Sequence, residues 1–220
     1  MKIDCLIPSR KLPFISILGL IQQVRKPDKV IIWADKMGES NLTLEYLAEL
    51  VDLEIIVKQP QSIGQKRKEF IFKSNADYVW LLDDDTFPLW DCLRNFEINL
   101  VRDRKFYQGM CLEPVGMVAR GEREWDIITG KEKPVKKLSQ GDTKNMFCQV
   151  KAFKNLVKDD KIVEELPMFE HTYLTKKMGG IIFVPKAKVY HIPSAESFSR
   201  SLDYYLNSKK LIDILIKYGK

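Results

Sequence analysis

The first half of the chain alternates between two hydrophobic periods. Short apolar runs bounded by polar residues are typical of strands, and longer segments with apolar residues every third or fourth position are typical of helices. The predicted strands are residues 2–7, 29–34, 53–58 and 77–82. The predicted helices between them are residues 14–24, 42–51 and 64–75. This alternation implies parallel strands joined by right-handed crossovers, and therefore an α/β fold with helices on both faces of the sheet.

The second half of the chain is less regular. Residues 113–144 are rich in charge, Gly and Pro and predict loops or a hairpin. The predicted strands are residues 105–112, 146–153, 181–185 and 187–192, and the predicted helices are residues 89–101, 167–179 and 197–220. We expect one domain over residues 1–220, with a nucleotide-binding half (1–110), an acceptor and catalytic half (111–193) and a C-terminal amphipathic helix (194–220).

Composition narrows the class of protein. A chain of 220 residues with 45% hydrophobic and 30% charged residues is typical of a soluble globular domain. The four cysteines are scattered without a CxxC pair, and we find no signal peptide or membrane-spanning stretch, so we expect a cytoplasmic protein with reduced thiols. The net charge of +6 favours anionic partners.

An acidic triplet ends the fourth predicted strand. Five apolar residues, 78–82, run directly into Asp83, Asp84 and Asp85. In an open parallel sheet, ligands bind at the carboxyl ends of strands near a switch in strand order. If the backbone stays extended, Asp83 and Asp85 leave the same face, and a divalent ion relieves their repulsion while it accepts phosphate oxygens. The triplet therefore predicts a Mg²⁺ or Mn²⁺ site that binds a diphosphate; the alternative is a solvated turn that caps the next helix.

Two other enzyme classes with an acidic strand end do not fit. Phosphatases with an aspartyl nucleophile require DxDxT, but Phe87 stands where that motif has its threonine. P-loop NTPases require GxxxxGK[ST], which the sequence lacks.

The ordered motifs resemble the GT-A fold glycosyltransferases, most closely family 2, which invert the anomeric carbon. "IDCLIPSRK" is similar to the family's opening strand and turn, "QVRKPDKVIIWADKMGES" to its second strand, "IGQKRKEFIFKSNADYVWLLDDD" to its DxD segment, and "FVPKAKVYHIPS" to a late strand that ends in His. The resemblance implies a Rossmann-like, mostly parallel central sheet flanked by helices.

The resemblance also implies which residues bind the donor and the metal. Asp83, Asp85 and His191 match the metal-binding positions. The donor nucleotide is expected to contact Pro8, Ser9, Arg10, Asp35, Lys66, Arg67, Asp83 and Asp84. Taken without the resemblance, the basic helix around Arg67 reads as a solvated face, Asp35 as the start of a turn, and His191 as a core or rim histidine.

The catalytic base is expected near residue 170, because "FEHTYLTKKMGG" resembles the family's segment that opens with an "ED" pair. Glu170 matches the Glu, and His171 stands where the base Asp is expected. Either side chain can accept a proton, Glu170 as a carboxylate and His171 as an imidazole. A charged helix start is the structural alternative.

The resemblance implies a metal-dependent transferase that takes a sugar from a UDP- or GDP-sugar. The acceptor is a hydroxyl of a glycan, a lipid-linked molecule or a protein. The basic C-terminal helix can also lie on an anionic membrane at the cytoplasmic face. A related nucleotidyltransferase is the first alternative, although "PSRKLPF" lacks its glycine-rich loop. A nucleic-acid-binding module is the second; we expect no nucleic acid partner because no reader motif is present.

Overall fold

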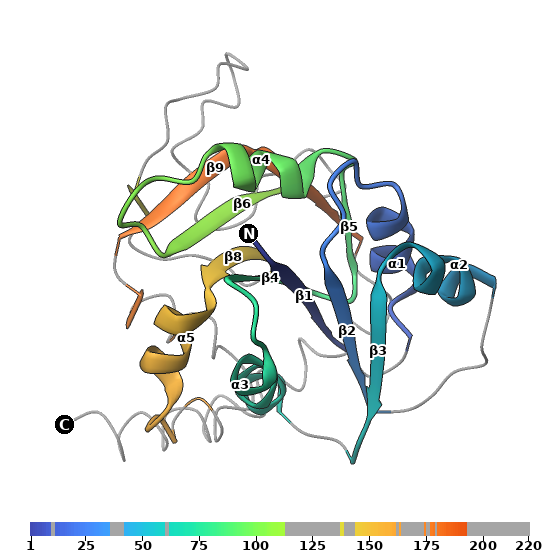
Figure 1. Ribbon diagram of the computed structural model, residues 1–220, viewed down its shortest axis with the longest axis horizontal. Helices are drawn as coiled ribbons and strands as arrows, with labels where there is room; N and C mark the ends of the chain where they lie inside the picture. Colours follow the sequence, from blue (N-terminus) through green and yellow to red (C-terminus); the bar gives the residue numbers. More distant parts are fainter. Residues whose placement is uncertain are drawn as a thin grey trace.

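The structure is a computed structural model, and it describes most of the first half and part of the second half of the chain (Figure 1). The described residues are 1–9, 12–35, 42–59, 62–112, 137–138, 144–161, 163, 174, 177–178 and 180–192. The predicted C-terminal helix, most of the predicted helix 167–179 and most of the segment 113–144 lie outside these residues.

The first half folds as its hydrophobic pattern predicts. Its strands are β1 (Ile3–Pro8), β2 (Lys29–Ala34), β3 (Asp52–Val57) and β4 (Tyr78–Leu82), and its helices are α1 (Phe14–Ile21), α2 (Leu42–Leu50) and α3 (Ile63–Lys73). The four strands are parallel in the order β3-β2-β1-β4. β1 lies between β2 and β4, so the strand order reverses at the β1–β4 pair. That reversal is where open α/β sheets bind ligands.

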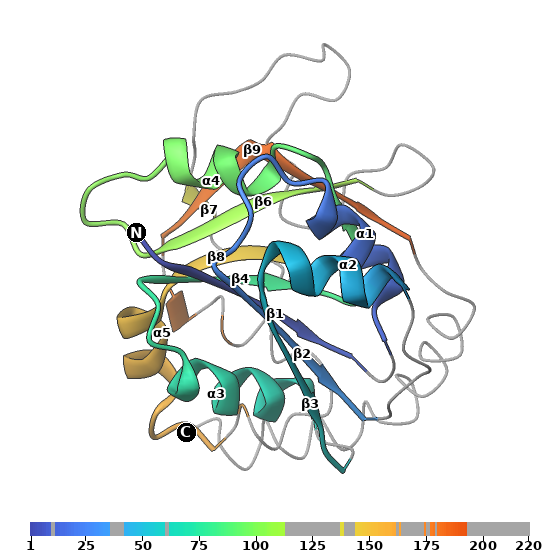
Figure 2. The same cartoon turned by 45° about the vertical axis from the view of Figure 1, so that its right-hand side comes forward.

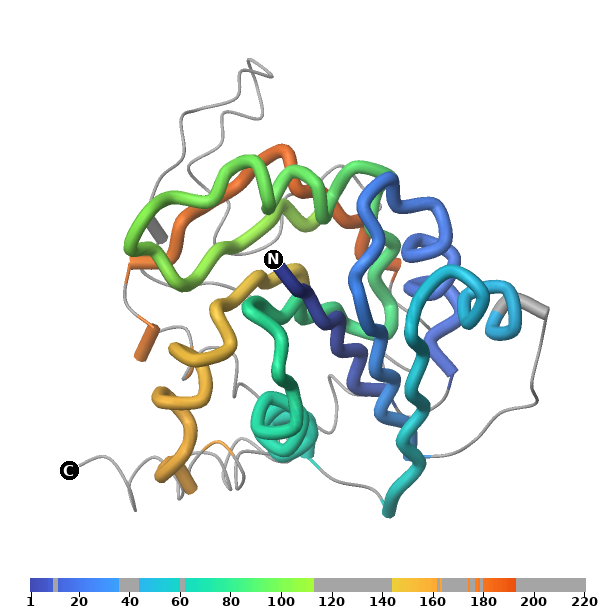
Figure 3. Tube along the Cα trace, in the orientation of Figure 1, coloured from blue at the N-terminus to red at the C-terminus, as the bar shows by residue number. Residues whose placement is uncertain are grey.

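The second half extends the same sheet with mixed pairing. Its elements are β5 (Thr86–Pro88), α4 (Cys92–Ile98), β6 (Phe106–Leu112), β7 (Lys137–Leu138), β8 (Asn145–Gln149), α5 (Val150–Val157) and β9 (Ile181–His191). β8 pairs antiparallel with β4 and with β6, β6 pairs parallel with β9, and β9 pairs antiparallel with β5 and β7. β9 therefore returns beside β6 and brings the late chain back to β5 (Figures 1 and 3).

Helices cover both faces of the sheet, as expected for buried strands with apolar residues on both sides. α1, α2 and α4 pack on one face, and α3 and α5 pack on the other (Figure 2). Alternate residues of each strand enter opposite cores; Trp80 and Leu82 join the first, and Val79 and Leu81 join the second. All four cysteines are buried thiols. Within the described part of the chain, no helix is long and apolar enough to cross a membrane.

Three predicted strands of the second half were wrong in extent. Residues 146–153 were predicted as one strand, but β8 ends at Gln149 and α5 follows directly. Val150, Phe153 and Val157 are buried at helical spacing, so the helical period begins inside the predicted strand. Residues 181–192 were predicted as two strands, but β9 is continuous, and Pro185 falls where the register with β6 shifts. A proline is tolerated there because the bulge requires no ladder hydrogen bond from it.

Candidate active site

Polar side chains from three strand ends meet at one edge of the sheet. Ser9 follows β1, Asp35 follows β2 and Asp83 follows β4. These strands are parallel neighbours, so their carboxyl ends lie together (Figure 2). The sequence-based prediction that these residues share one site is consistent with this placement.

The acidic triplet adopts a turn. β4 ends at Leu82, the chain turns at residues 84–85, and β5 begins at Thr86. The Asp83 carbonyl oxygen accepts hydrogen bonds from the Ser16 hydroxyl (2.9 Å), the Thr86 hydroxyl (2.7 Å) and the Thr86 amide (3.3 Å). The extended backbone that would place Asp83 and Asp85 on one face is therefore absent.

Each carboxylate of the triplet contacts a different partner. Asp83 Oδ1 accepts a hydrogen bond from the Arg67 guanidinium at 2.8 Å. Asp84 Oδ2 accepts one from the Ser9 hydroxyl at 2.8 Å. Asp85 Oδ2 lies 3.3 Å from His191 Nε2. The turn thus distributes three adjacent carboxylates between α3, β1 and β9.

Helix α1 contacts this turn through Ser16. The single hydrogen of the Ser16 hydroxyl is shared between two acceptors, the Asp83 carbonyl at 2.9 Å and the Thr86 carbonyl at 2.8 Å. Gly19 lies against Pro88 of β5 so closely that an added Cβ would stand 2.3 Å from the proline Cδ. Sequence reasoning missed Ser16 and Thr86. The available signal for Ser16 was a polar residue on the buried face of an otherwise apolar helix.

Two cations of α3 are buried next to the acidic carboxyl edge, on the face of the sheet opposite to α1. The side chains of Lys66 and Arg67 are 3% and 2% exposed. Lys66 Nζ lies 2.5 Å from Asp35 Oδ1 and donates to the Ser9 carbonyl oxygen at 2.8 Å. The reading of this helix as a solvated basic face is therefore wrong at these two positions. Buried charges persist only when they are paired, and both of these are.

His191 reaches the site through strand pairing. It ends β9 opposite Thr86 in the antiparallel β5–β9 pair, and the next amide, Ile192 N–H, donates to the Asp85 carbonyl at 2.8 Å. The His191 and Asp85 side chains are 14% and 15% exposed. This pair joins an imidazole to a carboxylate from residues 106 positions apart.

The donor set at this pair suits a divalent ion. A carboxylate oxygen and an imidazole nitrogen, both partly exposed, are accepted as ligands by Mn²⁺. Among the described residues, no group of three His, Cys, Asp or Glu side chains is close enough to hold a metal ion. Asp83 contacts Arg67 instead, so its predicted role as a metal ligand stays a prediction.

Three predicted site residues lie outside the described residues: Arg10, Glu170 and His171. Pro8 is the last residue of β1, in register with Trp33 of β2, and the Ser9 amide that follows it donates to the Trp33 carbonyl at 2.7 Å.

Comparisons with known proteins place the fold in context. No family model and no curated protein matches the sequence. Many solved structures match in fold, three of which follow. TarS residues 1–349 of S. aureus in complex with UDP is 16% identical, with a TM-score of 0.67 over 90% of this chain and 62% of that chain. GalNAc-T7 with UDP, GalNAc and Mn²⁺ is 11% identical, with a TM-score of 0.65 over 90% of this chain and 45% of that chain. A197 from STIV is 15% identical, with a TM-score of 0.56 over 88% and 87%.

These matches show the fold. The chain has the GT-A glycosyltransferase fold, as the sequence predicted. The match covers 38% of the length of the longer TarS chain and 62% of the length of the TarS chain in the UDP complex.

Proposed function

We propose that the chain is a metal-dependent glycosyltransferase that moves a sugar from a nucleoside-diphosphate donor to a hydroxyl acceptor, with inversion at the anomeric carbon. The observation that carries the proposal is the meeting of Ser9, Asp35, the acidic triplet and two buried cations at the strand-order reversal. UDP in the TarS and GalNAc-T7 structures, and Mn²⁺ in the latter, support it.

The proposed donor site uses the residues at the ends of β1, β2 and β4. Arg67 provides positive charge beside the diphosphate while its guanidinium keeps Asp83 in place. Ser9 fixes Asp84 through a hydrogen bond, so the turn presents its carboxylates in a defined direction. The donor itself is a UDP- or GDP-sugar.

Asp85 and His191 are the protein ligands proposed for Mn²⁺ or Mg²⁺. When bound, the ion would offset the negative charge that develops on the departing nucleoside diphosphate. The antiparallel β5–β9 pair fixes the distance between the two ligands, because Thr86 lies opposite His191 and the Ile192 amide bonds to Asp85.

The chemical step is proposed as direct displacement. A base removes the proton of the acceptor hydroxyl as its oxygen attacks the anomeric carbon, and the bond to the diphosphate breaks on the opposite side. Glu170 and His171 are the two candidates for that base. The acceptor is a glycan, a lipid-linked molecule or a protein.

Location is proposed from the sequence. We place the protein in the cytoplasm, with the basic helix 194–220 in contact with an anionic membrane surface when the acceptor is lipid-linked. We propose no nucleic acid partner.

Thermal unfolding with Mn²⁺ and a panel of nucleoside diphosphates, followed by a hydrolysis screen of nucleotide sugars, tests the proposal. Stabilisation is expected only when metal and diphosphate are both present, because a ligand that binds the native state raises the melting temperature. Asp85→Asn and His191→Ala should each remove it. Asp52→Asn is the control, since Asp52 begins β3 at the opposite edge of the sheet.

Other outcomes separate the alternatives. Release of pyrophosphate from a nucleoside triphosphate would support the nucleotidyltransferase. Stabilisation by an oligonucleotide without metal would support the nucleic-acid-binding module. Equal melting temperatures for all three variants with Mn²⁺ and diphosphate would refute the metal site at Asp85 and His191.

A further inference from the structure

Lys66 occupies an unusual place for a lysine beside a proposed nucleotide site. Its side chain is 3% exposed, so it cannot serve as a freely reaching phosphate ligand. Its ammonium group lies 2.5 Å from Asp35 Oδ1 and donates to the Ser9 carbonyl at 2.8 Å. Lys66 therefore links the residues that follow β1 and β2. Its predicted direct contact with the donor stays a prediction.

The contact with Lys66 divides the two oxygens of Asp35. Oδ1 is buried and forms an ion pair with the ammonium group, without a hydrogen bond among the described residues, whereas the Asp35 side chain as a whole is 12% exposed. A ligand at this strand end can therefore reach Oδ2 but not Oδ1. Asp35 presents one acceptor oxygen where an unpaired carboxylate would present two.

We propose that Lys66 is a positioning residue that sets nucleotide specificity, an inference that rests on the proposed function. By occupying Oδ1, it leaves Asp35 a single acceptor for the donor base. Uracil offers one imide N–H, which one oxygen satisfies. Guanine offers N1–H and the 2-amino group side by side, which require two oxygens, so one buried donor would be left without a partner. The site therefore favours uridine over guanosine diphosphates.

A network of polar contacts makes this selection rigid. Lys66 bonds to the backbone of Ser9, and the Ser9 hydroxyl bonds to Asp84 in the acidic turn. A base seated at Asp35 and a diphosphate near the turn are thereby fixed relative to one another. Precise placement of a few polar groups gives small-ligand sites their orientation and specificity.

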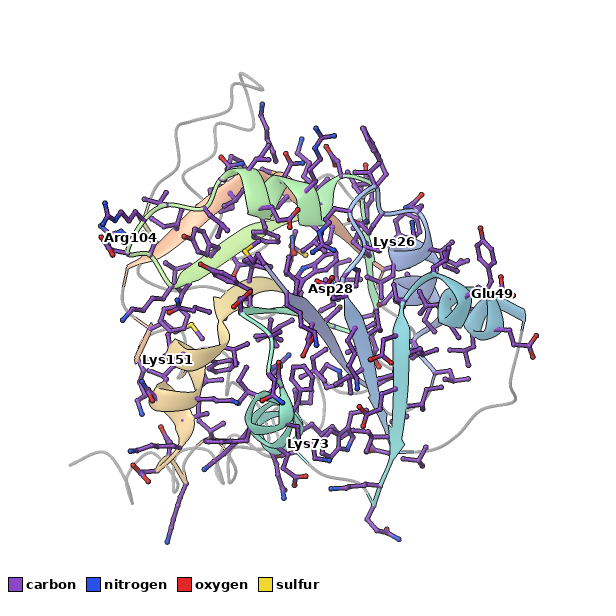
Figure 4. The ribbon with its side chains drawn as sticks, in the orientation of Figure 1. Lys26, Asp28, Glu49, Lys73, Arg104 and Lys151 are labelled. Atoms are coloured by element: carbon purple, nitrogen blue, oxygen red, sulfur yellow. The ribbon has the colours of Figure 1, made fainter. Side chains whose placement is uncertain are left out.

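The test is calorimetric binding of UDP and of GDP, each with Mn²⁺, to the full chain and its variants. The wild type should bind UDP about 10-fold more tightly than GDP, the ratio expected for one unsatisfied donor. Lys66→Met should bring the two affinities close together, because both Asp35 oxygens become available. Lys73→Met is the control; Lys73 lies at the other end of α3 and is exposed (Figure 4).

Asp35→Asn provides the second arm. It should remove the preference, and Lys66→Met should then add little, since residues that act through one another give non-additive effects. The double variant pairs two neutral side chains, so it reports on the site even where Lys66→Met alone fails to fold.

The outcomes separate the two proposals. A wild type that binds neither nucleotide contradicts the proposed function. A wild type that binds UDP and GDP equally, or a Lys66→Met variant that weakens both while it keeps their ratio, overturns the role of Lys66. A structural lysine would change stability but not the ratio.

Discussion

The two edges of the parallel sheet both carry carboxylates, but they use them differently. At the amino edge, Asp28 and Asp77 accept hydrogen bonds from the backbone amides of Ile3 (2.8 Å) and Lys2 (2.7 Å). These bonds fasten neighbouring strands where they begin. At the carboxyl edge, Ser9, Arg67 and His191 contact the acidic triplet through their side chains.

The cations differ more than the carboxylates. Arg25 at the amino edge is 28% exposed and lies 3.0 Å from Asp28 and from Glu97. Arg67 and Lys66 at the carboxyl edge are almost fully buried. Ion pairs that stay in contact with solvent stabilise a fold little. Burying a cation costs desolvation free energy, which often exceeds what its ion pair returns. The burial of its cations, rather than the presence of acidic residues, therefore distinguishes the carboxyl edge, where we propose the donor site, from the amino edge.

Removing one arginine from each edge should give the largest difference. Arg67→Met leaves Asp83 without its guanidinium, and we expect a loss of about 3 kcal/mol, as for a broken buried pair. Arg25→Met should cost less, about 1 kcal/mol, because its two ion pairs are partly exposed to solvent. Urea unfolding measures both values.

Binding provides the second readout for the same variants. Arg67→Met should also abolish stabilisation by UDP with Mn²⁺, and Arg25→Met should retain it. Equal losses of stability at the two edges would contradict the distinction between them.

Helix α1 offers a smaller effect that separates stability from the site. In Gly19→Ala, the new Cβ would stand 2.3 Å from Pro88 Cδ and 2.8 Å from its backbone nitrogen, so β5 must shift. We expect a loss of about 2 kcal/mol from overpacking. Because β5 carries the chain from the acidic turn, binding of UDP with Mn²⁺ should weaken as well.

Gly109→Ala is the matched control for this variant. Its Cβ would meet Asn145 Nδ2 at 2.1 Å and the Ala187 carbonyl at 2.4 Å, in the middle of β6. It should lower stability at least as much and leave the affinity of the remaining folded protein unchanged. If both variants weaken binding equally, α1 has no special part in placing the turn.

The elements of the first half could be predicted well, because the local hydrophobic period of each segment matches the helix or strand that it forms. All seven helices and strands through β4 follow local hydrophobic spacing, and parallel pairing then brings Ser9, Asp35 and Asp83 to one edge. The second half depends on pairing between distant segments. α5 begins inside the segment 146–153, which was predicted as one strand, and Pro185 is accommodated where β6 and β9 shift register beside it.

The site shows the same limit at the scale of single residues. That Asp83, Asp84 and Asp85 share a site followed from their position at a strand end. That each faces a different partner depends on a turn fixed by Ser16 from α1, which no local pattern reveals. The burial of Lys66 is likewise a consequence of how α3 packs on the sheet, since charged residues on a helix ordinarily face solvent.

The smallest expected effect is the pH dependence of the free energy of unfolding that carboxylates at the amino edge produce. Burial raises the pKa of Asp4 above its usual 3.8, against the opposing hydrogen bond from Ser74 at 2.6 Å. The folded state then binds more protons than the unfolded state as the pH rises above 3.8, so the free energy of unfolding falls through that window. Asp4→Asn should remove this fall.

Asp28 should behave in the opposite sense at the same edge. Burial raises the pKa of Asp28, but the hydrogen bond from the Ile3 amide and the Arg25 guanidinium outweigh it and keep that pKa below its usual 3.8. Its contribution to stability is therefore present at neutral pH and lost as the pH falls through the folded-state pKa. Asp28→Asn should lower stability at neutral pH and lose that deficit in acid.

Urea unfolding of both variants across the acid range, with and without Mn²⁺ and UDP, measures these opposite slopes. A structural carboxylate gives a difference from wild type that ligand does not change, because ligand stabilises variant and wild type equally when it does not touch the substituted residue. A difference at Asp4 or Asp28 that depended on Mn²⁺ and UDP would mean that the two edges are coupled, and the division between a structural edge and a binding edge would have to be abandoned.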